Sequence, residues 1–294
     1  MTEIYKRHEN LENFSKAIAQ QLSIGERKIN FLAQAELDTS SFRNHPLTDV
    51  TSKAKKWAQK DVPDDLIFNH GFFIGEGMNH LIAELANKPD SNRALYSLIN
   101  QKDIDGRGDE PIPSFMVFQC VVIDNILYCT AYFRALEVCN FLRINLEEMR
   151  LNICKILDSV KVDLVRMSVF TFSAYSKPMQ IPLEKCRLDR MSALALADKY
   201  SESYMPLADL IDEKSLETTA VIDSGLNAIN EWLGDERKEK WPKGLNVIPV
   251  RQAIGKALEV GARLRAVRKK FSYETMISSE YVDSIKKIAE EFRK

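Results

Sequence analysis

The mainly apolar stretch "IDNILYCTAYFRALEVCNFLRIN", residues 123–145, carries Arg134, Glu137 and Asn145, and side chains of these types can bind a ligand or hold a fold together. Arg134 follows a strand-like pattern, and a guanidinium at a strand end offers phosphate oxygens a planar fork of donors. Asn145 carries both a donor and an acceptor. In the competing, structural interpretation, Arg134 pairs with Glu137 or Glu147, and Asn145 satisfies a helix end.

Cysteine and histidine spacing predicts neither a metal centre nor a disulfide framework. The four histidines are scattered, and no two cysteines form a C-x-x-C pair. The five cysteines, an odd number, lie mostly in apolar segments, which favours reduced core thiols in a cytoplasmic protein. The cysteines are Cys120, Cys129, Cys139, Cys154 and Cys186.

Charge and hydropathy argue against nucleic-acid and membrane partners. The net charge is −1, so no global field attracts a polyanion. The polar start "MTEIYKRHEN" is unlike a secretory signal, and no apolar run reaches the roughly 18–20 residues of a spanning helix. The basic run "ARLRAVRKK", residues 262–270, is typical of a solvated helix end, although it could also contact a phosphate-rich partner.

The elements that must position Arg134 and Asn145 form a hairpin followed by a helix. Strands are predicted over 115–123 and 126–133, joined by a tight turn at Asp124-Asn125, with another strand over 162–175. Poor alternation in the hairpin suggests a sheet covered on both faces. We expect a helical period from just after Arg134, a helix over 78–87, a strand within 93–99, a loop over 103–113 and mostly helix in residues 1–60.

The character of the chain changes near residue 187. Beyond it, apolar residues recur at helical spacing, as in Ile222, Leu226, Ile229 and Leu233. The sequence therefore predicts an α+β domain over residues 1–187 and an all-helical C-terminal extension over residues 188–294.

The block from residue 113 to 145 resembles the central block of thymidylate synthases. That family's block can be laid on residues 113–145 without a gap. It runs P-C-H, then Q, a hairpin ending in L-x-C, then Y-Q-R-S-x-D, and finally F-N. "NKPDSNRALYSLIN" resembles the family's "NDPDSRRxIxSAWN", and "FSAY" stands where the family has a strand carrying H-x-Y. The resemblance covers roughly residues 75–180. Matching positions are Pro113, Gln119, Asp124, Leu127, Cys129, Tyr132, Arg134 and Asn145.

This resemblance implies a thymidylate-synthase-like large sheet with flanking helices and a pocket for a pyrimidine nucleotide. By position, Arg134 would bind the 5′-phosphate and Asn145 the base, while Tyr175 would contact the ribose. Arg93 would reach the partner subunit's phosphate across a two-fold axis, because family members dimerise by stacking their sheets back to back. Glu137 matches an acid near the folate pterin.

Departures from the family pattern remove its covalent chemistry. Ser114 stands in place of the nucleophilic cysteine, and a serine hydroxyl needs an adjacent base. The neighbouring histidine is replaced by Phe115, and the histidine of H-x-Y by Ser173. The buried thiol of Cys120 is an unconvincing substitute, because free core cysteines are usually inert. The resemblance thus predicts a retained anion site without catalysis.

The leading interpretation is a catalytically degenerate, homodimeric relative that binds a dUMP- or dCMP-like nucleotide as a sensor, regulator or scaffold. Its C-terminal helices would contact a protein partner, and no cofactor would be needed. One alternative is an active pyrimidine nucleotide methyltransferase or hydroxymethyltransferase, which would require tetrahydrofolate or another one-carbon donor. The other alternative is a structural subunit whose pocket has closed.

Overall fold

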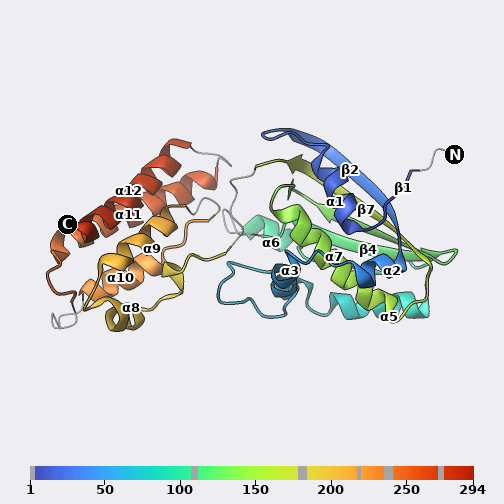
Figure 1. Ribbon diagram of the computed structural model, residues 1–294, viewed down its shortest axis with the longest axis horizontal. Helices are drawn as coiled ribbons and strands as arrows, with labels where there is room; N and C mark the ends of the chain where they lie inside the picture. The colour runs from blue at the N-terminus through green and yellow to red at the C-terminus, as the bar shows by residue number, and fades with distance from the viewer. Residues whose placement is uncertain (1–3, 107–111, 178–183, 217–219, 235–240, 271–274) are drawn as a thin grey trace. The chain divides into compact units, whose positions relative to one another are not determined.

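The computed structural model describes residues 4–106, 112–177, 184–216, 220–234, 241–270 and 275–294, which fall into two units (Figure 1). The first unit holds the described residues up to 63, 68–106 and 112–177. The second holds residues 64–67 and the described residues from 184 onward.

A seven-stranded mixed sheet organises the first unit. Its strands run in the order β1-β2-β7-β5-β4-β3, and β6 pairs with β7. β7 is antiparallel to β2 and parallel to β5, so it joins the two halves of the sheet. The strands are β1 (Lys6–Arg7), β2 (Arg27–Asp38), β3 (Leu95–Ser97), β4 (Phe115–Ile123), β5 (Ile126–Phe133), β6 (Leu136–Glu137) and β7 (Leu164–Tyr175).

The predicted hairpin is confirmed residue for residue in β4 and β5. Its turn residues Asp124 and Asn125 both have positive φ, 52° and 59°, the backbone of a two-residue turn that suits the twist of paired strands. The predicted strand over 162–175 is also confirmed, beginning at Leu164, and that within 93–99 is confirmed as the shorter β3. Arg134 follows directly after the last residue of β5, Phe133.

The expectation of a mostly helical first 60 residues is wrong. The twelve-residue strand β2 lies there, and Phe31, Ala33, Ala35 and Leu37 form its buried face at alternate positions. The segment "RKINFLAQAELD" therefore follows a period of two. Its partner β7 lies more than a hundred residues later along the chain.

Helices cover one face of this sheet, and α1, α2 and α7 run across it in Figure 1. The predicted helix over 78–87 is confirmed as α5, whereas the predicted loop over 103–113 is wrong up to residue 106, where α6 lies; residues 107–111 are outside the described part. The helices are α1 (Leu11–Ala19), α2 (Thr39–Asn44), α3 (Thr51–Trp57), α4 (His70–Ile74), α5 (Gly77–Asn87), α6 (Gln101–Gly106) and α7 (Phe141–Leu157).

The opposite face of the sheet is apolar but only partly covered by described residues, so one chain does not supply the expected cover on both faces. Leu32 is 49% exposed and Phe172 is 58% exposed. Tyr5 covers part of this face, since its hydroxyl lies 3.3 Å from that of Ser168 and its ring contacts Tyr128. Alternation was poor because both faces carry apolar side chains.

The described elements of the second unit are helical and have a core of their own. Inside it, Lys214 Nζ donates to Asp189 Oδ2 at 2.6 Å, and Asp189 Oδ1 accepts from the backbone N–H of Gly225. The elements are η1 (Leu188–Arg190), α8 (Ala193–Tyr200), α9 (Met205–Ser215), α10 (Ser224–Gly234), α11 (Val247–Arg268) and α12 (Thr275–Arg293).

Candidate functional site

Arg134 lies immediately after β5 and is held by backbone carbonyl groups. Its Nε donates to Pro113 O at 3.2 Å and its Nη2 to Ile112 O at 3.0 Å. No carboxylate among the described residues pairs with it, so the structural interpretation that pairs it with Glu137 or Glu147 is wrong. Desolvation lowers the pKa of Arg134 below its ordinary value, an effect that Tyr175 opposes. The guanidinium nevertheless stays charged and can receive an anion.

Glu137 is a helix cap rather than an open acid. Its carboxylate accepts from the backbone N–H groups of Cys139 at 2.8 Å, Asn140 at 2.7 Å and Lys177 at 2.9 Å. Cys139 and Asn140 lead into α7, and the N–H of Phe141, the first residue of that helix, also points to the carboxylate at 3.4 Å, where N–H groups lack partners within the helix. Because both carboxylate oxygens are engaged and the side chain is buried, we leave Glu137 out of the candidate site.

Asn145 and Ser173 bring polar groups without protein partners to the helix-covered side of the sheet. Asn145 lies one turn inside α7, and its amide makes no hydrogen bond within the described part of the chain although it is only 9% exposed. The buried hydroxyl of Ser173 likewise has no partner among the described residues. By strand alternation Ser173 and Tyr175 continue the face of Thr171, which lies beneath the helices. Buried polar groups need partners, so this side can receive a polar ligand.

Ser114 has no base within reach in the described residues. It lies in the bend before β4, where its carbonyl accepts from the backbone N–H of Arg134, and its hydroxyl makes no hydrogen bond there. The side chain of Phe115 stacks against Phe133 with ring centroids 4.9 Å apart. By the resemblance to thymidylate synthases, positions 114 and 115 would carry the nucleophile and its neighbouring histidine. In this chain they hold an unactivated hydroxyl and an aromatic ring of the core.

Arg93 lies far from Arg134 within one chain. Arg93 is exposed and lies just before β3, where Leu95 pairs with Gln119 of β4. The backbone N–H of Arg134 instead donates to the carbonyl of Ser114, which precedes β4. The five residues from Ser114 to Gln119 span roughly 16 Å at about 3.3 Å per residue, and this distance separates the two arginines along the sheet. A single chain does not bring the two arginines to one phosphate.

Sequence reasoning missed a row of buried polar residues on α7. Glu148 Oε2 lies 2.7 Å from Nδ1 of His70, which comes from α4. One turn further, Nδ2 of Asn152 donates to the hydroxyl of Tyr96 at 2.9 Å. The sequence carries one feature that could have predicted this row: residues 145, 148 and 152 recur at the spacing of one helix face.

A second carboxylate of α7 belongs to the frame of the unit. Glu147 receives the Nε and Nη2 groups of Arg150, the backbone N–H of Leu47 and the hydroxyl of Thr51. Its oxygens are therefore fully used in joining α7 to the loop before α3.

The helix predicted from the apolar stripe after Arg134 is α7, but it begins only at Phe141 because Leu136 and Glu137 form β6.

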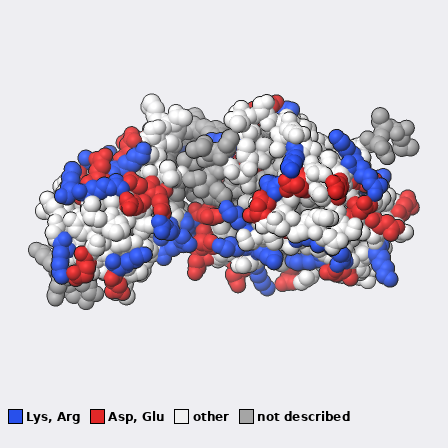
Figure 2. Space-filling model, viewed as in Figure 1, with Lys and Arg blue, Asp and Glu red and all other residues white. Residues whose placement is uncertain are grey.

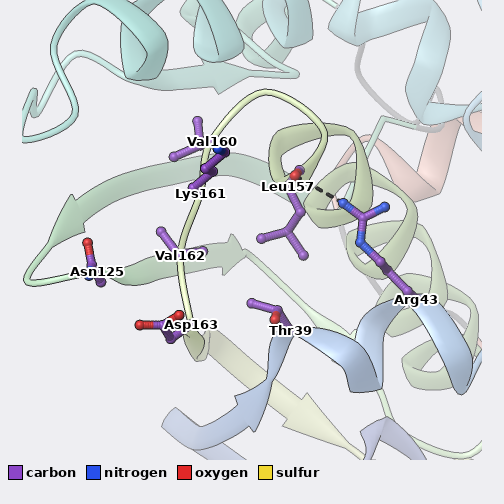
Figure 3. A pocket seen from close by; sticks show the side chains of 8 residues that line it. All are labelled: Thr39, Arg43, Asn125, Leu157, Val160, Lys161, Val162 and Asp163. Atoms are coloured by element: carbon purple, nitrogen blue, oxygen red, sulfur yellow. Dashed lines mark hydrogen bonds between the residues drawn. The ribbon is translucent and has the colours of Figure 1, made fainter.

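A cavity of about 290 Å³ lies near the other end of β5, beside the Asp124-Asn125 turn (Figure 3). Arg43 on its wall already donates to Leu157 O and pairs with Asp158. The cavity holds none of the predicted site residues. Its lining residues are Thr39, Arg43, Asn125, Leu157, Val160, Lys161, Val162 and Asp163.

Within the described residues, no group of three or more His, Cys, Asp or Glu side chains could hold a metal ion. None of the described helices is long and apolar enough to cross a membrane.

Basic and acidic side chains are interspersed over the face seen in Figure 2. In the basic run, Arg263 pairs with Glu280 and Arg265 with Asp223. These pairs agree with a solvated helix end.

Comparison with known proteins adds no assignment. No protein-family model matches the chain, and no curated protein matches it.

Proposed function

We propose that the first unit is a thymidylate-synthase-like domain that binds a pyrimidine nucleoside monophosphate without methylating it. The observation that carries this proposal is Arg134, which two carbonyl oxygens hold at a strand end with no carboxylate partner among the described residues. A charged guanidinium in that state retains capacity for a phosphate. Asn145 and Ser173 supply groups for the base and the nucleoside, and Tyr175 lies close enough to Arg134 to raise its pKa, against the larger effect of desolvation.

The lack of covalent chemistry follows from the residues next to Arg134. With the hydroxyl of Ser114 unactivated, attack on a pyrimidine ring has no nucleophile of the family type. Binding without turnover suits a sensor, a regulator or a scaffold. The helical second unit would then contact a protein partner, and neither tetrahydrofolate nor a metal would be required.

Calorimetry with dUMP, dCMP and dTMP tests nucleotide binding directly. Arg134→Ala should weaken the affinity about tenfold or more, because a charged hydrogen bond contributes roughly 1.5–3 kcal/mol. Arg43→Ala is the matched control, since Arg43 also donates to a backbone carbonyl but lies at the opposite end of β5. Equal affinity of the wild type and Arg134→Ala would refute the phosphate site.

Exchange of tritium from C5 of labelled dUMP or dCMP separates a binder from an enzyme. Attack at C6 labilises that hydrogen, so the proposal expects no exchange above the rate without protein. Sustained exchange would instead support the active transferase, and no binding of any nucleotide would support the structural subunit with a closed pocket.

We infer a homodimer built on the uncovered sheet face. The exposed side chains of Leu32, Tyr132 and Phe172 lie on β2, β5 and β7, and a second copy offers the same surface in return. A dimer also lets Arg93 reach the phosphate bound by the second copy, because Arg93 and Arg134 of one chain are too far apart to share a phosphate. Sedimentation should give a dimer for the wild type and a monomer for Phe172→Asp; a monomeric wild type at micromolar concentration would exclude this arrangement.

A further inference from the structure

The buried pair of His70 and Glu148 has an acceptor to spare. Glu148 is 0% exposed, and its Oε2 is held by His70 Nδ1 at 2.7 Å. Its Oε1 is buried with no hydrogen-bond partner among the described residues. An unpaired acceptor at such depth costs stability unless a donor from outside the protein fills it.

This oxygen belongs to the same part of the unit as the candidate site. Glu148 lies three residues after Asn145 on α7, so their Cβ atoms are about 5–6 Å apart on one helix face. The ring of His70 lies 5.7 Å from that of Phe115, which follows Ser114. Phe115 in turn stacks on Phe133, the residue before Arg134. The pair of His70 and Glu148 therefore packs near the end of β5 that Arg134 follows.

The hydrogen-bonding groups of the bases decide which pyrimidine the proposed site prefers. Cytosine presents a 4-amino donor beside the N3 acceptor, whereas uracil presents a 4-carbonyl acceptor beside an N3–H donor. The Asn145 amide can donate or accept, so it fits either base at N3. A carboxylate oxygen can only accept, and it would repel the uracil carbonyl.

We propose that Glu148, fixed in place by His70, accepts a hydrogen bond from the amino group of the ligand, so that the site selects a cytosine nucleotide over a uracil nucleotide. This inference rests on the proposed function, because it names the base for the nucleotide site proposed there. The two nucleotides share ribose and phosphate, which makes the ratio of their affinities a measure of the base edge alone.

Other charged and titratable groups near the pair do not compete for this role. The phenol of Tyr96 and the thiol of Cys120 are neutral neighbours, because burial raises the pKa of each well above its ordinary value. Glu147 points to Arg150 and Thr51 and has no oxygen to offer. Of these ionisable groups, Glu148 is thus the one with a carboxylate oxygen available to a ligand amino group.

The test compares dCMP and dUMP by calorimetry on the full chain. The wild type should bind dCMP about tenfold or more tightly than dUMP, the range set by one unsatisfied buried acceptor. In Glu148→Gln, the amide oxygen keeps the His70 bond and the NH2 group replaces Oε1, so the preference should fall or reverse towards dUMP. Glu147→Gln makes the same change one residue away, and the wild-type preference should persist there.

Each result discriminates. Equal affinities or a dUMP preference in the wild type would overturn this inference and leave nucleotide binding intact. No binding of either nucleotide would overturn both the inference and the proposed function. An unchanged preference in folded Glu148→Gln would assign Oε1 to ordered water. The wild-type ratio remains decisive if that variant does not fold.

Discussion

Two buried acid-containing pairs, one in each unit, differ in a way that separates structure from function. In the helical unit Asp189 meets Lys214 at 2.6 Å, and in the sheet unit Glu148 meets His70 at 2.7 Å. Both acids are almost fully buried, and each pair joins distant parts of the chain. Burial and pairing alone therefore do not distinguish them.

The difference lies in the second carboxylate oxygen. Asp189 Oδ1 receives the backbone N–H of Gly225 at 2.7 Å and the hydroxyl of Ser224 at 3.2 Å. Glu148 Oε1 receives nothing from the described residues. Native proteins leave few buried polar groups unsatisfied, and such a group is a place where an ordered water or a ligand can bind. Counting donors on each oxygen is thus more informative than noting an ion pair.

The same isosteric change at both sites tests this comparison, and the largest effect is expected at Asp189. In Asp189→Asn one amide N–H must face Lys214 Nζ or the N–H of Gly225, and the buried Lys214 loses the carboxylate that it contacts at 2.6 Å. We expect the free energy of unfolding of the helical unit to fall by about 3–5 kcal/mol. Urea unfolding can be followed by Trp232 and Trp241 fluorescence once Trp57 is replaced by Phe.

Glu148→Gln should cost the sheet unit much less, under about 1.5 kcal/mol. The variant keeps a neutral hydrogen bond to His70, removes a buried charge and leaves one unpaired group where one already stood. Trp57, whose ring is 4.7 Å from that of His70, reports on this unit in a chain with Phe at positions 232 and 241. A cost equal to that of Asp189→Asn would remove the distinction between the two pairs.

The sequence predicts local parts of the fold well and distant pairings poorly. The hairpin of β4 and β5 was placed correctly because its register depends on the turn at Asp124-Asn125 and on adjacent residues. β2 was missed because its buried face includes Ala33 and Ala35, which suit a helix equally, and because its partner strand is far away. Tertiary pairing decided that segment.

The candidate site divides in the same way. Arg134 and Asn145 were recognisable because they lie within one continuous block that resembles a known family. The pair of His70 and Glu148 was not, because 78 residues separate its members and each looks ordinary in its own segment. Glu137 was assigned to a ligand from its position, whereas the folded chain uses it to cap α7.

Arg143 supplies the exposed counterpart of the two buried pairs, and the smallest expected effect. It bonds Asp49 at 2.6 Å and Glu12 at 2.8 Å near the surface. These hydrogen bonds lower the folded-state pKa of both acids below their ordinary values of 3.8 and 4.5. Their contribution is therefore fully present above those values and is lost as the pH falls through the lowered folded-state pKa. Water and salt screen such pairs, so Arg143→Gln should cost under about 1 kcal/mol at pH 7. The difference in unfolding free energy from the wild type should shrink in acid; a difference that grows there would contradict this assignment.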